Sequence, residues 1–203
     1  MKAVSVLSYG VGNIKSVARA LEATGASVSL IATPEEVLTA ERLVLPGVGA
    51  FSACSNSLKA NGLWDPIVEY LSSEKPFLGI CVGMQLLFEK SEEFGEFSGF
   101  GVVKGRVCRL PKRENSKIPL VGWKQIKPIQ DTPLFDKSNA GQYYFVHSFA
   151  GVCEDDNDCL ATYDYAGVSV TAAVKRGAVM GTQFHPEKSA AAGLQLLSRF
   201  LEL

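Results

Sequence analysis

The stretch of residues 76–90 constrains the fold of this chain more than any other. Its first five residues form a short apolar run that is typical of a buried strand, and its last six favour the first turns of a helix. Cys81 stands between these two segments, flanked by Gly79 and Gly83. Glycines on both sides allow a sharp turn that leaves the central side chain projecting from the end of a sheet. The pattern therefore predicts a strand, a tight elbow and a helix, with a thiol at the turn.

The elbow also bears on the chemistry of Cys81. At the N-terminus of a helix, unpaired N–H groups favour the thiolate form, which is the nucleophilic one. The N–H of Val82, directly after the cysteine, would be placed to bind an oxyanion. The alternative is that Cys81 is a small buried hydrophobic residue, as most cysteines outside such a motif are. The elbow favours a nucleophile, provided that the chain also supplies a base.

Strands and helices alternate through the first half of the chain. Short apolar runs at residues 3–7, 28–31 and 42–45 predict strands that precede the elbow strand. Helical spacing follows the first of these runs, and Thr33 begins a second helix with a capping-box glutamate at Glu36. Helices are also expected between Gly49 and the elbow strand. Such an alternation predicts a mostly parallel sheet covered by helices.

The pattern changes after Gly95, where helical signals become rare. A final helix is expected from Ser189 onward. Between these two points we expect strands near residues 102–110, 121–126, 143–149, 160–163, 168–174 and 179–184. The predicted fold class is therefore α/β, with a central, mostly parallel sheet flanked by helices and additional antiparallel strands in the C-terminal half. The chain length of 203 residues predicts a single domain over residues 1–203.

Composition and missing motifs exclude several function classes. A net charge of −1 gives no electrostatic footprint for nucleic acid, and no apolar run approaches the roughly 18 residues of a membrane span. Five cysteines without C-x-x-C spacing, and no signal peptide, predict reduced thiols and a cytoplasmic protein. Phosphate-loop, dinucleotide and zinc signatures are missing, so we expect no cofactor and no metal.

A base for Cys81 is available in His185, one of only two histidines in the chain. It ends an apolar run, and Pro186 favours an extended conformation for it. Glu187 follows two residues later, and in an extended chain such residues point to the same side. A carboxylate beside an imidazole orients the ring and stabilises the imidazolium. A surface His-Pro-Glu turn is the alternative, but the elbow cysteine favours a Cys-His-Glu triad.

Three further features concern the surroundings of this triad. The segment of residues 46–49, Pro-Gly-Val-Gly, ends a neighbouring strand at the same edge of the sheet and could supply a second oxyanion donor, although an ordinary tight turn is the alternative. Gln85 lies on the first helical turn after Cys81 and could hold a small substrate. The second histidine, His147, lies within an apolar and aromatic run, where a structural role is favoured.

Residues 79–85 and 184–187 resemble the motifs of class I (triad) glutamine amidotransferases, and the resemblance extends over nearly the whole chain. The segments 9–13, 46–49, 122–123 and 144–148 are similar to those of the glutaminase subunits of imidazole glycerol phosphate synthases. The resemblance implies that Cys81 attacks the carboxamide of glutamine to form a thioester and release ammonia. His185 would protonate the leaving group and then activate water, with Glu187 orienting it.

The same resemblance implies roles for residues around the triad. Oxyanion donors would be the N–H groups of Val48 and Val82, and the loop of residues 46–49 would act as a switch. The glutamine pocket would be lined by Gly49, Gln85, Ser148 and Phe149. The partner would be a cyclase subunit, a (β/α)₈ barrel that forms a heterodimer with this chain and receives the ammonia to make imidazole glycerol phosphate and aminoimidazole carboxamide ribotide in histidine biosynthesis. The residues facing it would be Asn13, Trp123, Tyr144 and Lys188.

One position departs from the family pattern. Lys124 follows the Gly-Trp pair, where asparagine is usual in this family. That leaves open a paralogue that supplies ammonia to another synthase, for example one that amidates a surface-polysaccharide sugar. Two other classes remain as alternatives: a non-catalytic binding module that keeps the fold, and a cysteine hydrolase that acts alone.

Overall fold

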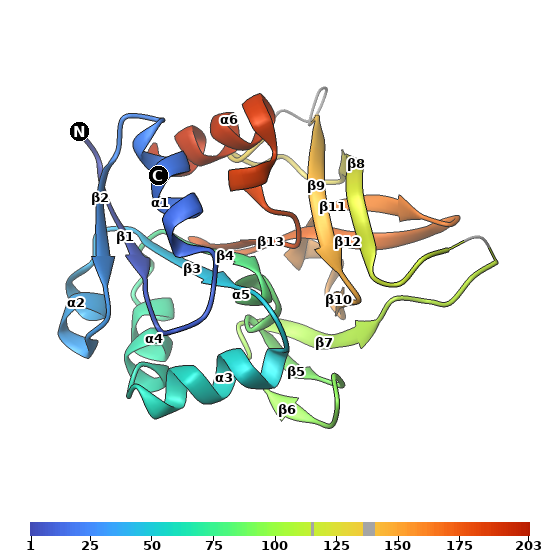
Figure 1. Cartoon of the computed structure of the whole chain (residues 1–203), viewed down its shortest axis with the longest axis horizontal. Helices are drawn as coiled ribbons and strands as arrows, with labels where there is room; N and C mark the ends of the chain where they lie inside the picture. The colour runs from blue at the N-terminus through green and yellow to red at the C-terminus, as the bar shows by residue number, and fades with distance from the viewer. Residues whose placement is uncertain (115, 136–140) are drawn as a thin grey trace.

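The computed structural model describes residues 1–114, 116–135 and 141–203. A nine-stranded sheet crosses the molecule (Figure 1). In spatial order its strands are β2 (Ser27–Ile31), β1 (Ala3–Leu7), β3 (Leu43–Gly47), β4 (Phe77–Cys81), β13 (Val179–Thr182), β12 (Val168–Arg176), β11 (Cys159–Tyr165), β8 (Leu120–Pro128) and β9 (Gln142–His147).

The direction of the strands changes at β13. From β2 to β13 neighbouring strands are parallel, and from β13 to β9 each pair is antiparallel. The predicted α/β fold with antiparallel strands in its C-terminal half is therefore confirmed. The turn at Arg176 and Gly177 joins β12 to β13, as the sequence predicts.

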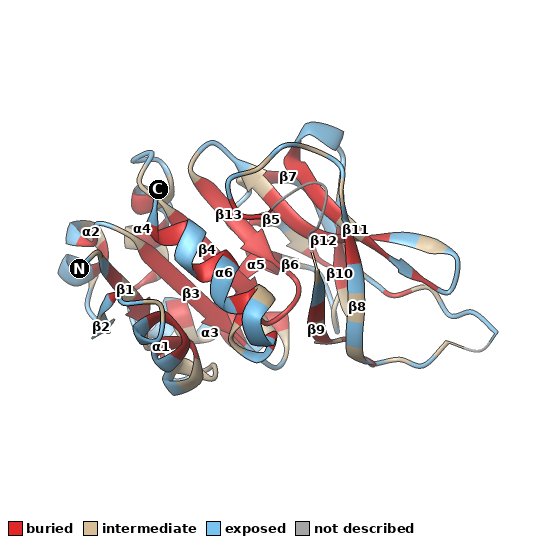
Figure 2. Cartoon of the chain, turned by 90° about the horizontal axis from the view of Figure 1, so that it is seen from above, coloured by how far each residue is buried: buried red, intermediate tan, exposed pale blue. Residues whose placement is uncertain are grey.

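Helices cover both faces of the parallel half (Figure 1). On one face lie α1 (Ile14–Glu22) and α6 (Ala190–Leu201), and on the other lie α2 (Pro34–Thr39), α3 (Phe51–Ala60) and α4 (Trp64–Leu71). Every residue of β3 and β4 is buried, which explains their continuous apolar sequences (Figure 2). Helix α2 begins with the predicted capping box: the Glu36 N–H donates to Thr33, and the Thr33 N–H donates to the Glu36 carboxylate.

A second, four-stranded sheet lies beside the antiparallel half, and one of its strands forms where the sequence predicts a helix. Its order is β10 (Phe149–Cys153), β7 (Val103–Arg109), β5 (Phe88–Ser91) and β6 (Phe97–Ser98). The predicted helix over residues 85–90 is wrong, because the elbow helix α5 (Val82–Gln85) ends after four residues and the chain enters β5. The ring of Phe88 fills the space that a Cβ on Gly151 would need, so packing against β10 outweighs the local helical preference.

The predicted strand over residues 143–149 is also corrected, because it is broken at Ser148. His147 ends β9 and pairs with Leu120 of β8, whereas Phe149 begins β10 and pairs with Arg109 of β7. The chain therefore passes from one sheet to the other within three residues. This change of sheet brings the backbone of residues 147–149 to the edge where the parallel strands end.

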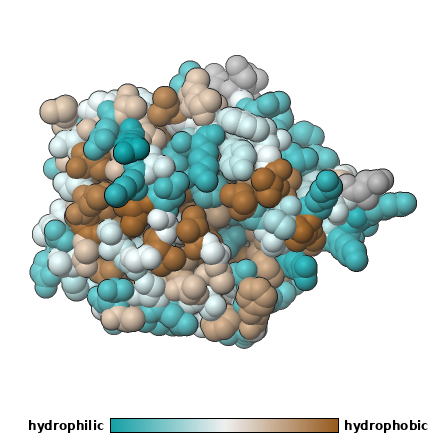
Figure 3. All heavy atoms as spheres, viewed as in Figure 1, coloured by the Kyte–Doolittle hydropathy of each residue, from teal (hydrophilic) through white to brown (hydrophobic). Residues whose placement is uncertain are grey.

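The surface seen in Figure 3 carries an apolar band across its middle, bordered by polar side chains. Large apolar residues that stay exposed include Val121 at 57% and Trp123 at 47%, both on β8. Among the described residues, no helix has the length and hydropathy needed to cross a membrane.

Candidate active site

Cys81 ends β4 and precedes α5 in a tight elbow. Its φ of 56° lies in the left-handed region, which is strained for a residue with a side chain. The flanking glycines are required by close packing: a Cβ on Gly79 would meet the Gly83 carbonyl, and one on Gly83 would collide with the Leu45 carbonyl oxygen of β3. The sequence pattern thus encodes a helix start pressed against two strand ends, with the sulfur directed into a cavity.

His185 and Glu187 form a buried pair. The Nδ1 of His185 lies 2.8 Å from Oε1 of Glu187, and both side chains are almost fully excluded from solvent. We expected an extended chain between the two residues, but Pro186–Lys188 forms a single 3₁₀ turn instead. His185 itself is extended, as its following proline favours, and the turn after it carries the carboxylate back to the ring.

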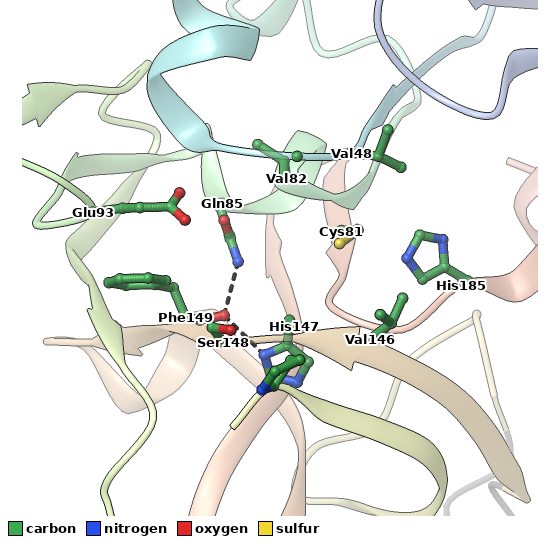
Figure 4. Close-up of a pocket in the computed structure, with 12 residues that line it drawn as sticks. Val48, Cys81, Val82, Gln85, Glu93, Val146, His147, Ser148, Phe149 and His185 are labelled. Atoms are coloured by element: carbon green, nitrogen blue, oxygen red, sulfur yellow. Dashed lines mark hydrogen bonds between the residues drawn. The ribbon is translucent and has the colours of Figure 1, made fainter. Parts of the chain in front are cut away.

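The other edge of the imidazole faces Cys81. Among the described residues, Nε2 of His185 has no hydrogen-bond partner, and in Figure 4 the ring lies beside the sulfur. Burial alone would lower the pKa of His185, but interaction with the Cys81 thiolate and with Glu187 outweighs burial and raises the pKa to about 9. The site therefore favours the protonated, imidazolium form of His185.

A cavity of 270 Å³ opens above Cys81 and brings most of the predicted site residues together (Figure 4). Its volume is near the lower end of small-molecule sites, about 300 Å³. Of the predicted residues, those on its wall are Val48, Gly49, Cys81, Val82, Gln85, Ser148, Phe149 and His185. Glu187 stands behind His185. Within the described part of the chain, no group of three or more His, Cys, Asp or Glu residues could hold a metal ion.

The two predicted oxyanion donors belong to adjacent strand ends. Val82 is the first residue of α5, and Val48 follows β3, whose Gly47 is aligned with Cys81. Two side chains hold the end of β3 and the loop that follows it. The Tyr9 hydroxyl donates to the Pro46 carbonyl at 2.7 Å, and the Cys54 thiol donates to the Val48 carbonyl at 3.5 Å. Both valines line the cavity, on the same side as the sulfur.

The comparisons with known proteins agree with this geometry. Residues 5–202 match the family model "Glutamine amidotransferase class-I". The chain is a class-I glutamine amidotransferase.

Relatives within the family are similar over nearly the full length of this amidotransferase. It is 50% identical to "Imidazole glycerol phosphate synthase subunit HisH" of Zymomonas mobilis, over 98% of this chain and 95% of the relative. It is 39% identical to "Imidazole glycerol phosphate synthase hisHF, chloroplastic" of Arabidopsis thaliana, over 98% of this chain but 34% of that longer protein. A solved structure, "Structure of PurLQS from Thermotoga maritima", shares the fold with a TM-score of 0.77, at 22% identity and covering 100% and 99% of the two chains.

Glu93 is a cavity residue of the amidotransferase that the sequence reasoning missed. Its carboxylate accepts a 2.7 Å hydrogen bond from the Phe51 N–H at the start of α3, and in Figure 4 it lies beside Gln85. It is the acidic member of the cavity wall among the described residues. The sequence offers no motif around it, since it stands in a short acidic stretch that resembles an ordinary solvated turn.

His147, which we expected to be structural, also lines the cavity. Its Nδ1–H donates to the Phe149 carbonyl at 2.8 Å, and its Nε2 accepts from the Tyr163 hydroxyl at 3.1 Å. Burial lowers the pKa of His147 to about 4, so the ring is neutral. Both ring nitrogens are engaged with protein groups, as the structural interpretation requires.

Three of the four predicted interface residues form one cluster outside the cavity. Trp123 and Tyr144 are cross-strand neighbours whose ring centroids are 6.1 Å apart, and the Lys188 ammonium lies 5.9 Å from the Tyr144 ring centroid. Asn13, the fourth, stands at the N-cap of α1. Lys124 is the next residue on β8 after Trp123 and is half-buried.

Proposed function

We propose that this amidotransferase is the glutaminase subunit of an imidazole glycerol phosphate synthase, and that residues 1–203 act as one glutaminase domain. The observation that carries the proposal is the meeting of Cys81 with the His185–Glu187 pair in one cavity of amino-acid size. Its similarity to the synthase subunits of Zymomonas mobilis and Arabidopsis thaliana supplies the rest of the assignment. Its five cysteines are free thiols, which supports a cytoplasmic location.

The first half-reaction forms a thioester. The Cys81 thiolate attacks the carboxamide carbon of glutamine, and the N–H groups of Val48 and Val82 bind the oxygen that becomes negative. The imidazolium of His185 then gives its Nε2 proton to the departing nitrogen, so that ammonia leaves and a glutamyl thioester remains. Glu187 keeps the ring oriented through Nδ1 and stabilises its charge.

The second half-reaction releases glutamate. His185, now neutral, takes a proton from a water molecule as that water attacks the thioester. The tetrahedral intermediate collapses by expelling the Cys81 thiolate, and the proton held by His185 restores the starting ion pair. The product leaves as a carboxylic acid that ionises in water, so the overall balance is glutamine plus water giving glutamate, ammonia and one proton.

The cavity suits glutamine at both ends. We assign the α-ammonium of the substrate to the Glu93 carboxylate, because opposite charges attract strongly in a partly closed site. The carboxamide then reaches Cys81, with Gly49, Gln85, Ser148 and Phe149 along the path between them. The Phe149 carbonyl already accepts hydrogen bonds from Gln85 and His147, which leaves its N–H and ring for the substrate.

The ammonia requires a sealed path to its acceptor. In water at pH 7 it becomes mostly ammonium, which is not nucleophilic. We propose that a cyclase subunit, a (β/α)₈ barrel, docks as a heterodimer on the face carrying Asn13, Trp123, Tyr144 and Lys188. The solvent-exposed indole of Trp123 in this cluster supports the assignment, because aromatic residues are enriched at protein interfaces. The Pro46–Gly49 loop would then respond to docking by turning its peptide toward the oxyanion.

The decisive experiment measures glutamine hydrolysis by the full chain with and without its cyclase partner. Cys81→Ala should lower ammonia release about 1,000-fold or more, because the thioester forms on the Cys81 sulfur and alanine has no sulfur. Cys108→Ala, on strand β7, is the matched control and should leave turnover unchanged. Retention of near-normal hydrolysis by Cys81→Ala would refute the mechanism.

The cyclase arm tests the acceptor. If adding the cyclase together with its phosphorylated ribulose substrate stimulates hydrolysis and yields imidazole glycerol phosphate, the assignment holds. Lys124, on the strand that carries Trp123, is the one feature that favours a second candidate, a paralogue serving another synthase. Hydrolysis that the cyclase neither binds nor stimulates would favour that paralogue.

A further inference from the structure

Gln183 is a buried polar residue that the proposed mechanism does not use. It directly follows β13, and its side chain has no exposed surface. Strand β13 runs parallel to β4 with Thr182 aligned to Ile80, so the next residue along β13 falls beside Cys81. The amide Nε2 of Gln183 lies 3.7 Å from the Cys81 sulfur, within hydrogen-bonding distance for sulfur.

The direction of this amide is set by a second glutamine. Gln85 donates through its Nε2 to the Oε1 of Gln183 at 3.1 Å and to the Phe149 carbonyl at 2.9 Å. An amide has an accepting oxygen on one side and a donating nitrogen on the other. Because the oxygen of Gln183 is held by Gln85, its NH₂ group is turned toward the sulfur.

The network continues away from the cavity to strand β11. The Phe149 carbonyl also accepts from His147, and His147 in turn accepts from Tyr163. Tyr163 is fully buried, so its hydroxyl cannot exchange this partner for water. In each of these hydrogen bonds the donor and the acceptor are therefore fixed. The network from Tyr163 to Gln85 holds the Gln183 amide in a single orientation.

We propose that Gln183 is a further catalytic residue, whose amide N–H donates to the Cys81 sulfur, favours its thiolate and holds it in line with His185. The proposal rests on the glutaminase function proposed above. A hydrogen bond to an anion is roughly twice as strong as one between neutral groups. The bond is strongest before attack and weakens once the sulfur becomes part of the thioester, so Gln183 acts on the amount of reactive thiolate.

Other titratable groups on the surrounding elements interact electrostatically with Cys81. They are His185 after β13, Tyr9 after β1 and Cys54 in α3. Substitution of Gln183 leaves all three in place. A change in the pH dependence of Cys81 reactivity that follows such a substitution therefore reports the lost donor.

Two variants separate the donor from the rest of the side chain. Gln183→Glu keeps an oxygen that can accept from Gln85 but turns a second oxygen toward the sulfur. Gln183→Met removes both polar groups and keeps a similar length. Thr182→Val is the control, because it deletes a neighbouring buried hydrogen bond, from the Thr182 hydroxyl to the Phe184 carbonyl, without touching Cys81.

The experiment follows alkylation of Cys81 by iodoacetamide in the full chain, using the mass of the peptide that contains it. Both Gln183 variants should lower the alkylation rate at pH 7 by about 10- to 100-fold and raise the pH of half-maximal reaction by about one unit. Thr182→Val should react like the unchanged protein. In the cyclase complex, kcat for glutamine should fall by a similar factor in both Gln183 variants, with KM changing less than about threefold, because Gln183 does not line the cavity wall that would contact glutamine.

The possible outcomes decide the proposal. If a folded Gln183→Glu or Gln183→Met protein keeps the original pH dependence of alkylation, the hydrogen bond does not stabilise the thiolate. An equal shift in Thr182→Val would also overturn the proposal, because the cause would then be packing. If one of the two Gln183 variants fails to fold, the alkylation of the other variant decides the test. Because alkylation needs no glutamine, an altered Cys81 reactivity in a protein without glutaminase activity would refute the proposed function and the catalytic role of Gln183, and would leave only its hydrogen bond to the Cys81 sulfur standing.

Discussion

The two histidines of this chain lie on the wall of the same cavity and are set up for opposite protonation states. His185 follows β13 in the central part of the sheet, and its pKa is raised to about 9. His147 ends the edge strand β9, and its pKa is lowered to about 4. Both rings are buried, with exposed fractions of 2% and 7%, so burial alone cannot separate them.

The difference comes from the groups that each ring meets. His185 lies between two groups that can carry negative charge, Cys81 and Glu187, and these stabilise its cation. His147 meets a carbonyl and a hydroxyl, which satisfy a neutral imidazole without compensating a charge. In the proposed mechanism, His185 transfers a proton, whereas His147 holds neighbouring groups in place.

The largest expected effect tests this division of roles directly. His185→Asn should lower kcat for glutamine hydrolysis in the cyclase complex by about 100- to 10,000-fold, because it removes the proton donor and base. His147→Asn should lower kcat by less than about tenfold, since it disturbs only the orientation of the Phe149 carbonyl. Ammonia release measures both. Equal losses in the two variants would contradict the assignment of His185 as the proton-transfer group.

The next effect concerns stability in acid. The pKa of His147 is about 4 when folded and 6.5 in its ordinary state, so below pH 6.5 the unfolded chain binds a proton that the folded chain does not. Stability is therefore complete above pH 6.5 and falls by about 3 kcal/mol in all as the pH decreases toward 4. Urea unfolding at several pH values should show this slope, and His147→Gln should lack it. A variant that keeps the full slope would show that His147 is not its source.

His185 contributes in the opposite sense. Its folded pKa of about 9 lies above its ordinary value of 6.5, so its contribution is fully present below pH 6.5 and is lost as the pH rises through about 9. The same unfolding series, extended to alkaline pH, records this loss. Taken together, the two histidines favour greatest stability near pH 6.5.

The smallest expected effect tests which neighbouring group raises the pKa of His185. Glu187→Gln removes a negative charge 2.8 Å from the ring, so the pKa of His185 should fall. The alkaline limb of the pH profile of kcat/KM, expected near pH 9 in the unchanged protein, should then move to lower pH by about one unit. A limb that stays in place would assign the shift to Cys81 alone.

Sequence reasoning found the parts of the site that local motifs encode. The Gly79-x-Cys81-x-Gly83 spacing predicted the elbow, and the structure shows why: a side chain at either glycine would strike a backbone carbonyl. The same reasoning went wrong after Gln85, where it expected the helix to continue. A run of buried leucines and phenylalanine satisfies either a helix or a strand, and pairing with β7 together with packing against β10 decides between them.

Other site residues carried too weak a signal. Glu93 reaches the cavity because β5 and β6 place their turn against α3, a contact between segments that are 42 positions apart. Gln183 stands two residues before His185, and that spacing is a weak indication of a shared face. Its role depends on the register between β13 and β4, which a single sequence does not contain.

The amino-acid sequence by itself determined the alternation of strands and helices, the elbow and the identities of the thiol, imidazole and carboxylate, because these depend on neighbouring residues and on backbone sterics. The tertiary structure decided how far apart those groups lie, which of the two histidines becomes a cation and which amide faces the sulfur. The physical reason is that electrostatic and hydrogen-bonding energies depend on distance and orientation in space. Residues more than a hundred positions apart acquire both only when the sheet aligns β4 with β13.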